Sequence, residues 1–115
     1  MSNEPLNEWH DVEVEVLRNT PQDEARFETA CLNLLAQSRL ELNYHATRMH
    51  AMIMELGAVH AVRRLLDDPK IHEGFVKMMA ANRPDLTLES LVLHESWRDL
   101  FTPAQRLTAR ARLLS

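Results

Sequence analysis

The chain has 115 residues, enough for one domain around a single core, and 45% of them are apolar. Its formal net charge of −4 argues against a protein that binds nucleic acid through overall positive charge. Two glycines and five prolines are too few for the many tight turns of a sheet-rich domain. We therefore expect an all-α fold, a compact irregular bundle of five or six helices with an acidic N-terminal arm.

The single cysteine, Cys31, rules out an intrachain disulfide and any multi-cysteine zinc site. No apolar run approaches the roughly 18 residues of a membrane span. The first residues are acidic and polar, which is the reverse of a signal peptide. We therefore expect a cytoplasmic protein with no membrane partner.

The N-terminal segment 1–19 is predicted to be an acidic arm ahead of a single helical domain, 20–115. Residues 1–28 hold eight acidic side chains against two arginines, whereas residues 29–115 carry a net charge of +2. Within the arm, Val12, Val14 and Val16 alternate with acidic residues, which is the period of a strand. No second segment offers a pairing partner. Three alternatives stay open: a helix, an extended arm packed on the body, or a strand paired with the same segment of another chain.

The first clear helix is predicted over residues 21–42, with Thr20 as its N-cap and Pro21 at its first position. Its apolar stripe follows helical spacing and consists of Phe27, Cys31, Leu34, Leu35, Ser38 and Leu42. Since Cys31 lies on this stripe, we interpret it as a small buried hydrophobic residue rather than a reactive thiol.

Three further apolar segments follow, and Gly57 separates the first two as a predicted C-cap. The second segment, 58–66, would turn Val59, Val62, Leu65 and Leu66 inward, and Asp68 would cap a helix that continues to about residue 81. The junction at Gly57 also fits a DNA-reading helix-turn-helix. Its second helix offers only His60, Arg63 and Arg64 as outward polar groups, so a structural helical hairpin is favoured.

Six histidines suggest a metal site, but their spacing does not support one. His45 and His50 point in directions about 140° apart on a helix, and no HExxH motif occurs. Glu41 and His45 do have the spacing of two ligands on one helix. There is also no Gly-x-Ser-x-Gly motif and no phosphate-binding glycine loop. We expect no metal, no cofactor and no catalytic residue.

The C-terminal part shows the clearest pattern. Thr87 is a predicted N-cap for a helix over 88–95, followed by an apolar cluster of Trp97, Leu100 and Phe101. Thr102 and Gln105 form a capping-box pattern at the start of the last helix. We expect that helix to turn Ala104, Leu107, Ala111 and Leu114 inward, with Arg106 and Arg110 on its outer face.

The run from Tyr44 to Leu113 resembles a small bacterial helical domain of unknown function, found alone or at the C-terminal end of larger proteins. The matching text is "YHATRMHAMIMELGAVHAVRRLL", then "GF", "RPDLTLESLVL", "W..LFT" and "ARARL". This chain departs from the family at Met49, Ala58 and Pro84, where the family has a larger aromatic residue, a second glycine and leucine. The resemblance implies a compact helical fold and a bacterial or phage origin, and it carries over no catalytic residue.

The motif residues of this region have two interpretations. The set is Gly57, Arg83, Asp85, Thr87, Glu89, Trp97 and Phe101. In the structural interpretation, which we favour, Arg83 and Asp85 pair across the bend while Trp97 and Phe101 are apolar anchors. In the functional one, Arg83, Asp85, Glu89 and Trp97 converge on a pocket.

Two functions remain from these observations. The first is a non-enzymatic module that binds another protein, or itself as a homodimer, through the arm or a methionine-lined groove. Its predicted interaction residues are Val12, Val14, Val16, Met52, Met78 and Met79. The alternative is a nucleic-acid-associated accessory protein. Its predicted phosphate-facing residues are Arg63, Arg64, Arg98, Arg106, Arg110 and Arg112.

Overall fold

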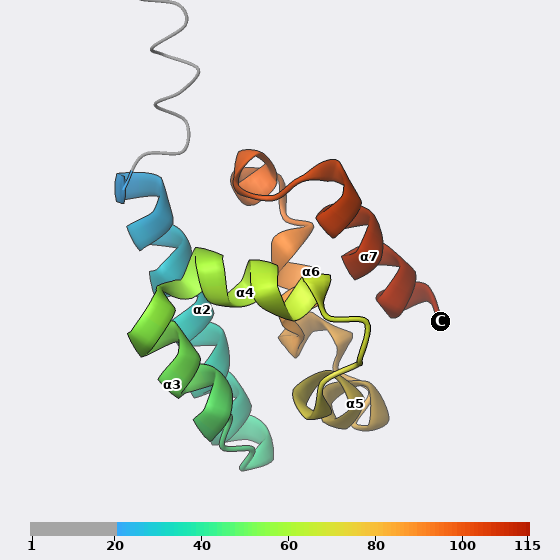
Figure 1. The fold of residues 1–115 in the computed structure, drawn as a ribbon. Coiled ribbons are helices and arrows are strands. Elements are labelled where there is room, and N and C mark those ends of the chain that lie inside the picture. Colours follow the sequence, from blue (N-terminus) through green and yellow to red (C-terminus); the bar gives the residue numbers. More distant parts are fainter. Residues whose placement is uncertain (1–20) are drawn as a thin grey trace, which may run out of the picture.

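The computed structural model describes residues 21–115, and every regular element in this range is a helix (Figure 1). In chain order they are α2 (Pro21–Leu42), α3 (Thr47–Leu56), α4 (Ala58–Asp67), α5 (Glu73–Ala80), the 3-10 helix η2 (Pro84–Leu86), α6 (Leu88–Val92), the 3-10 helix η3 (Glu95–Leu100) and α7 (Pro103–Leu114). The all-α prediction is confirmed. Predictions for the arm, including Val12, Val14, Val16 and the Thr20 cap, lie outside the described residues.

Helix α4 lies at the centre of the arrangement. It contacts α2 and α3 on one side and α7 on the other, and α6 packs against α7 (Figure 1). Its predicted inward residues Val59, Val62, Leu65 and Leu66 are all buried. Within residues 21–115 no helix has the length and apolar character that crossing a membrane requires.

Phe27 of α2 is the hub of the aromatic core. It is fully buried and makes edge-to-face contacts with Trp97 and Phe101, with ring centroids 5.4 Å and 5.2 Å away. The predicted apolar cluster after α6 therefore exists, and α2 supplies its central residue. Cys31, one turn further along α2, is also fully buried.

Several predicted helix ends are confirmed, and their side chains make the expected bonds. The Thr87 hydroxyl accepts from the Ser90 N–H at 3.0 Å. Thr102 and Gln105 form both bonds of a capping box, each at 3.1 Å. Each bond satisfies an N–H group that the helix itself leaves unpaired.

Two predicted helix ends are wrong. His72, not Asp68, caps α5, because its Nδ1 accepts from the Phe75 N–H, while the Asp68 carboxylate accepts from Lys70. The helix predicted over 88–95 ends at Val92, and the chain continues into η3. There the His94 ring accepts from the Ser96 N–H and starts the 3-10 turn.

The bend between α5 and α6 is held by the Arg83 guanidinium. Arg83 donates two hydrogen bonds to Asp85, at 3.0 Å and 2.9 Å, and a third to Glu41 at the end of α2. These bonds lower the pKa of both carboxyl groups, with Gln37 also donating to Glu41. The predicted Arg83–Asp85 pair is confirmed, and its additional partner ties the bend to α2.

Gly57 joins α3 to α4 with a φ of +84°, a backbone conformation that favours glycine. A Cβ at this position would meet its nearest neighbour, Glu28 Oε1, at 3.9 Å, so crowding is not the obstacle. We expect Gly57→Ala to lower the free energy of unfolding by about 1–3 kcal/mol through backbone strain alone, because a φ of +84° with a ψ of 151° is a region that essentially only glycine occupies. Urea denaturation measures this loss. Gly74→Ala, inside α5 where φ is not positive, should cause no such loss, and equal losses would contradict the explanation.

The predicted inward face of α7 is wrong. Ala104, Leu107, Ala111 and Leu114 are exposed, and the buried residues are instead Gln105, Ala109 and Arg112. Polar contacts decide the register, because the Gln105 amide reaches the Asp67 carboxylate while Arg112 binds a buried glutamate. Ala109, fully buried, is small enough to let α7 approach α6 closely. Arg106 is half-buried, so of the predicted outer pair only Arg110 is exposed.

Candidate functional site

A groove of about 740 Å³ opens among α3, α5, the end of α4 and the C-terminal half of α2. Its apolar lining includes three methionine and two aromatic side chains, and we call it the methionine groove. The apolar and aromatic residues that line it are Leu35, Tyr44, Met49, Met52, Leu65, Ile71, Phe75, Met78, Leu86 and Leu88. Of the predicted interaction residues, Met52 and Met78 line this groove. Met79 is half-buried and does not.

The polar lining of the groove carries more positive than negative charge. Arg48, Arg64 and Lys70 are exposed cations, and Asp68 and Glu73 are the carboxylates. One of these carboxylates is already engaged, since Asp68 Oδ1 accepts from the Lys70 N–H at 2.9 Å. The groove therefore combines an apolar interior with a mildly basic edge.

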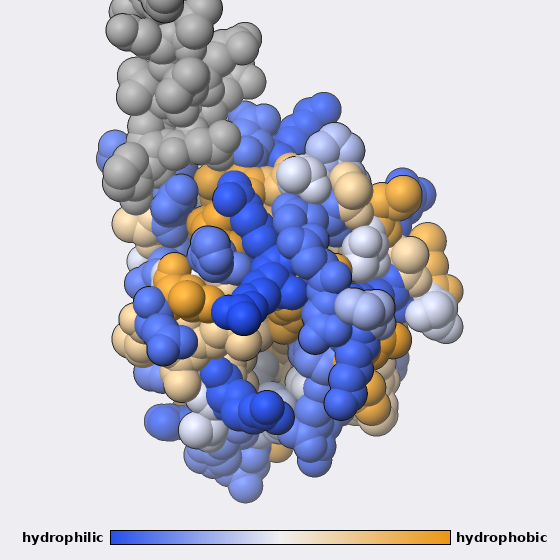
Figure 2. All heavy atoms as spheres, in the orientation of Figure 1, coloured by the Kyte–Doolittle hydropathy of each residue, from blue (hydrophilic) through white to orange (hydrophobic). Residues whose placement is uncertain are grey.

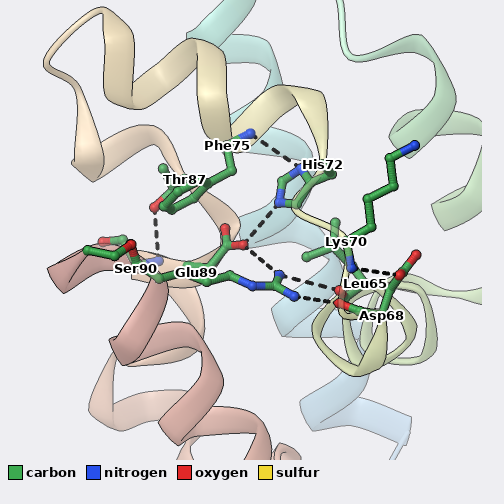
Figure 3. Close-up of polar contacts among 10 residues, drawn as sticks. Leu65, Asp68, Lys70, His72, Phe75, Thr87, Glu89 and Ser90 are labelled. Carbon is green, nitrogen blue, oxygen red and sulfur yellow. Dashed lines mark hydrogen bonds and ion pairs between the residues drawn. The ribbon is translucent and has the colours of Figure 1, made fainter.

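A buried ion cluster lies behind the wall of the groove. Glu89 of α6 is fully buried, and its Oε2 accepts from His72 Nε2 at 3.0 Å and from Arg112 Nη1 at 3.1 Å (Figure 3). Arg112 also donates to the carbonyl oxygens of Leu65 and Asp68 at the end of α4, at 3.4 Å and 2.6 Å. The cluster thus joins four parts of the chain: α6, α7, the end of α4 and the start of α5.

The contacts of His72 fix the orientation of its ring and indicate its tautomer. Nδ1 accepts from the Phe75 N–H at 3.3 Å, so this nitrogen carries a lone pair and the ring proton is on Nε2, facing Glu89 (Figure 3). Burial alone would raise the pKa of Glu89, but the hydrogen bonds that its carboxylate accepts, from His72 first and also from Arg112, outweigh burial and leave this pKa below its ordinary value. Both ring nitrogens are therefore occupied by structural bonds.

Contacts of this kind position helices, and they engage the groups of the cluster that could otherwise transfer a proton. The carboxylate–imidazole pair has the chemistry of a general base, but its imidazole has no free nitrogen to accept a proton. The Thr87 hydroxyl beside it donates to the Pro84 carbonyl at 2.7 Å. For Cys31, burial first and the charge of Glu28 second raise the thiol pKa to about 12, so its reactive thiolate is suppressed.

A second cavity, of about 360 Å³, lies at the junction of α3 and α4. Glu28 and Gly57 line it, and Glu28 Oε1 accepts from the Ala58 N–H at 3.0 Å. A carboxylate at a helix N-terminus is a favourable electrostatic arrangement. Since the chain's own carboxylate already occupies this position, the cavity has no open anion site.

The six arginines predicted to face phosphate do not form one surface. Arg112 is buried in the ion cluster, which contradicts its assignment. Arg63, predicted to point outward, is half-buried and donates to the Leu100 carbonyl at 2.9 Å and 2.6 Å. Arg98 is paired with Glu95, and Arg64 lies at the groove. Only the α7 residues Arg106 and Arg110 remain together.

The motif residues do not converge on a pocket either. Arg83 and Asp85 pair at the bend, Glu89 is in the ion cluster, and Trp97 packs on Phe27. Among residues 21–115 no group of three or more histidine, cysteine or carboxylate side chains is arranged to hold a metal ion. Within the predicted ligand pair, Glu41 bonds Arg83 whereas His45 bonds Asn43.

Sequence reasoning missed Met49 and Phe75 as groove residues, and it missed the partners of Glu89. Met49 lies three residues before Met52 on the same helix, so its position beside a predicted groove residue was the available signal. No family model, curated protein or solved structure matches this chain.

Proposed function

We propose that this protein is a non-enzymatic interaction module that receives the apolar face of a helix from another protein in the methionine groove. The observation that carries this proposal is the groove itself, about 740 Å³ in volume and lined by Met49, Met52 and Met78. Methionine side chains are flexible and polarizable, and they adapt to apolar partners of varied shape. An amphipathic helix in an apolar groove is a recurrent mode of recognition.

The charges at the groove specify the partner further. Arg48, Arg64 and Lys70 favour acidic residues beside the partner's apolar anchors. The engaged nitrogens of His72 support a binding role over catalysis, because this polar group of the groove lining is already used in packing the fold. The arginines divided among separate contacts give no such support to nucleic-acid binding.

Selection of peptides tests the proposal. A display library of helical peptides should yield binders with apolar residues at i, i+3 or i+4, and i+7, flanked by acidic residues. Met52→Glu should weaken binding of a selected peptide by more than about tenfold, because the apolar face would have to desolvate a charge. Isothermal titration calorimetry gives both dissociation constants. Met54→Glu is the control, since Met54 is on the same helix, 56% exposed and outside the groove lining.

A second pair of variants distinguishes a loss of binding from a loss of folding. Met52 is half-buried against the core, whereas Ile71 lines the groove and is 44% exposed. Ile71→Glu should weaken binding with no change in melting temperature, and Val76→Glu, on exposed α5 surface, should alter neither. If neither groove substitution weakens binding relative to its control, the groove is not the binding site.

A further inference from the structure

The outer face of α7 carries an apolar stripe that no part of residues 21–115 covers. Its members, spaced three, four and three residues apart, are Ala104, Leu107, Ala111 and Leu114, and we call them the α7 stripe. Leu107 is 67% exposed and Leu114 is 76% exposed. Figure 2 shows apolar side chains along the edge of the molecule where α7 lies. Spacing of this kind is typical of a helix face that packs against another segment.

The charges around the stripe favour an acidic partner. Arg106 and Arg110 lie beside the stripe, and α7 contains no acidic residue. Among residues 21–115 neither arginine forms an ion pair, and the Arg106 Nε has no hydrogen-bond partner there. A second copy of α7 placed against the first would bring arginines together, which is unfavourable. The stripe therefore suits an apolar segment that carries negative charge.

The N-terminal segment 1–19 has this composition. It holds five acidic residues and Arg18, so its formal charge of −4 equals that of the whole chain. It also contains Leu6, Trp9 and the three valines Val12, Val14 and Val16. Apolar and acidic groups are thus combined in the one segment that lies outside the described residues.

The described chain begins at the end of the molecule where α7 also begins (Figure 1). Phe27 contacts Phe101, two residues before α7 begins, and Pro21 precedes Phe27 by about 9 Å along the helix. The N-terminal end of α2 and the start of α7 lie at the same end of the molecule (Figure 1). Nineteen residues can span up to roughly 60 Å, which exceeds the ~18 Å length of α7. The methionine groove is farther away, since its α2 residues, Leu35 and Ser38, lie roughly 20–25 Å along that helix.

We propose that residues 1–19 dock on the α7 stripe of their own chain, with their acidic side chains beside Arg106 and Arg110. The covalent connection gives the segment an effective concentration in the millimolar range, which favours this contact over one between chains. Docking removes Leu107 and Leu114 from water and places negative charge beside half-buried Arg106 and exposed Arg110. It also leaves the methionine groove open, so the two surfaces work independently.

Paramagnetic relaxation tests this contact in the full-length chain. A nitroxide on an Asn7→Cys variant labels the arm selectively, because Cys31 is fully buried and its thiol pKa is about 12. We expect selective loss of the amide signals of the α7 stripe and Arg110, while those of α3 persist. Leu107→Glu should restore the α7 signals, and Leu40→Glu, at an 81% exposed position of α2, should not.

Isotope mixing separates contact within one chain from contact between chains. The mixed sample contains nitroxide-bearing chains without ¹⁵N and ¹⁵N-labelled chains without nitroxide. Only the second kind gives amide signals, and the proposal predicts that its α7 signals keep their intensity. Loss in this mixed sample equal to that in the singly labelled chain would overturn the intrachain proposal and indicate exchange between copies. Signals of α7 that persist in both samples, or loss centred on Met49 and Met52, would overturn docking on the stripe.

Discussion

Replacing Glu89 with glutamine is expected to lower the free energy of unfolding by about 3–5 kcal/mol, because it leaves the charge of Arg112 buried without a counter-ion. Glu89 is fully buried and Arg112 is 8% exposed, so water cannot replace the lost partner. The same substitution weakens the His72 contact that holds the start of α5. Four parts of the chain meet at this cluster, and we therefore expect a loss of global stability rather than local fraying.

Urea denaturation at neutral pH measures this effect, with Glu95→Gln as the matched control. The Glu95–Arg98 pair is exposed on both sides, and such pairs contribute about 0–1 kcal/mol. Equal losses for the two variants would show that the buried cluster contributes no more than a surface pair. Arg112→Met combined with Glu89→Leu should cost less than the two single changes together, because neither charge is then left unpaired.

The stability contributed by Glu89 should depend on pH in one direction. Its pKa in the folded protein lies below the ordinary value because His72 and Arg112 favour the carboxylate more than burial opposes it. The contribution is therefore present above the unfolded-state pKa, about 4.3, and is lost as pH falls through the lower folded-state pKa. The stability difference between the wild-type protein and Glu89→Gln should shrink in this acid range. A stability difference between the two proteins that grows as the pH is lowered would contradict a lowered pKa for Glu89.

Phe27→Ala is expected to lower the free energy of unfolding by about 3–5 kcal/mol, the range seen for large aromatic residues cut to alanine in cores. Phe27 is fully buried and contacts both Trp97 of η3 and Phe101 directly after it, so its removal leaves a cavity where α2 meets this part of the chain. Domains of this size have total stabilities of roughly 5–15 kcal/mol. The variant should therefore melt at a much lower temperature than the parent.

Leu40→Ala is the control, since Leu40 belongs to the same helix and is 81% exposed. Calorimetry should show a melting temperature close to that of the parent for Leu40→Ala and a large decrease for Phe27→Ala. A small decrease for Phe27→Ala would mean that the aromatic cluster is not the hub of the core.

The sequence predicted those elements whose signals are local. Pro21 followed by apolar residues at helical spacing located α2, and Thr102 with Gln105 located the start of α7, because caps depend on residues three apart. The α7 face was mispredicted because apolar periodicity ignores partners far away in the chain. Arg112 turns inward to Glu89, which lies 23 residues earlier in the chain. A contact between residues so far apart cannot be inferred from one sequence.

The sequence predicted that a groove would be lined by methionines, but it predicted less well which residues line it. Met52 and Met78 were both predicted to line a methionine groove, although they are 26 residues apart in the sequence. Whether they share a surface depends on where α5 docks, and the bonds of His72 to Phe75 and Glu89 determine that. Met79, next in sequence to Met78, turns away from the groove, which a one-residue change on a helix explains.

The most direct test of the interaction-module proposal is methyl NMR of the methionines with a selected helical peptide. The chain has six methionines, so each methyl signal can be assigned by single substitution. Binding in the methionine groove predicts that the signals of Met49, Met52 and Met78 shift on titration while that of exposed Met54 stays in place. Shifts confined to Met54 or Met79, with the three groove signals unchanged, would contradict the proposal.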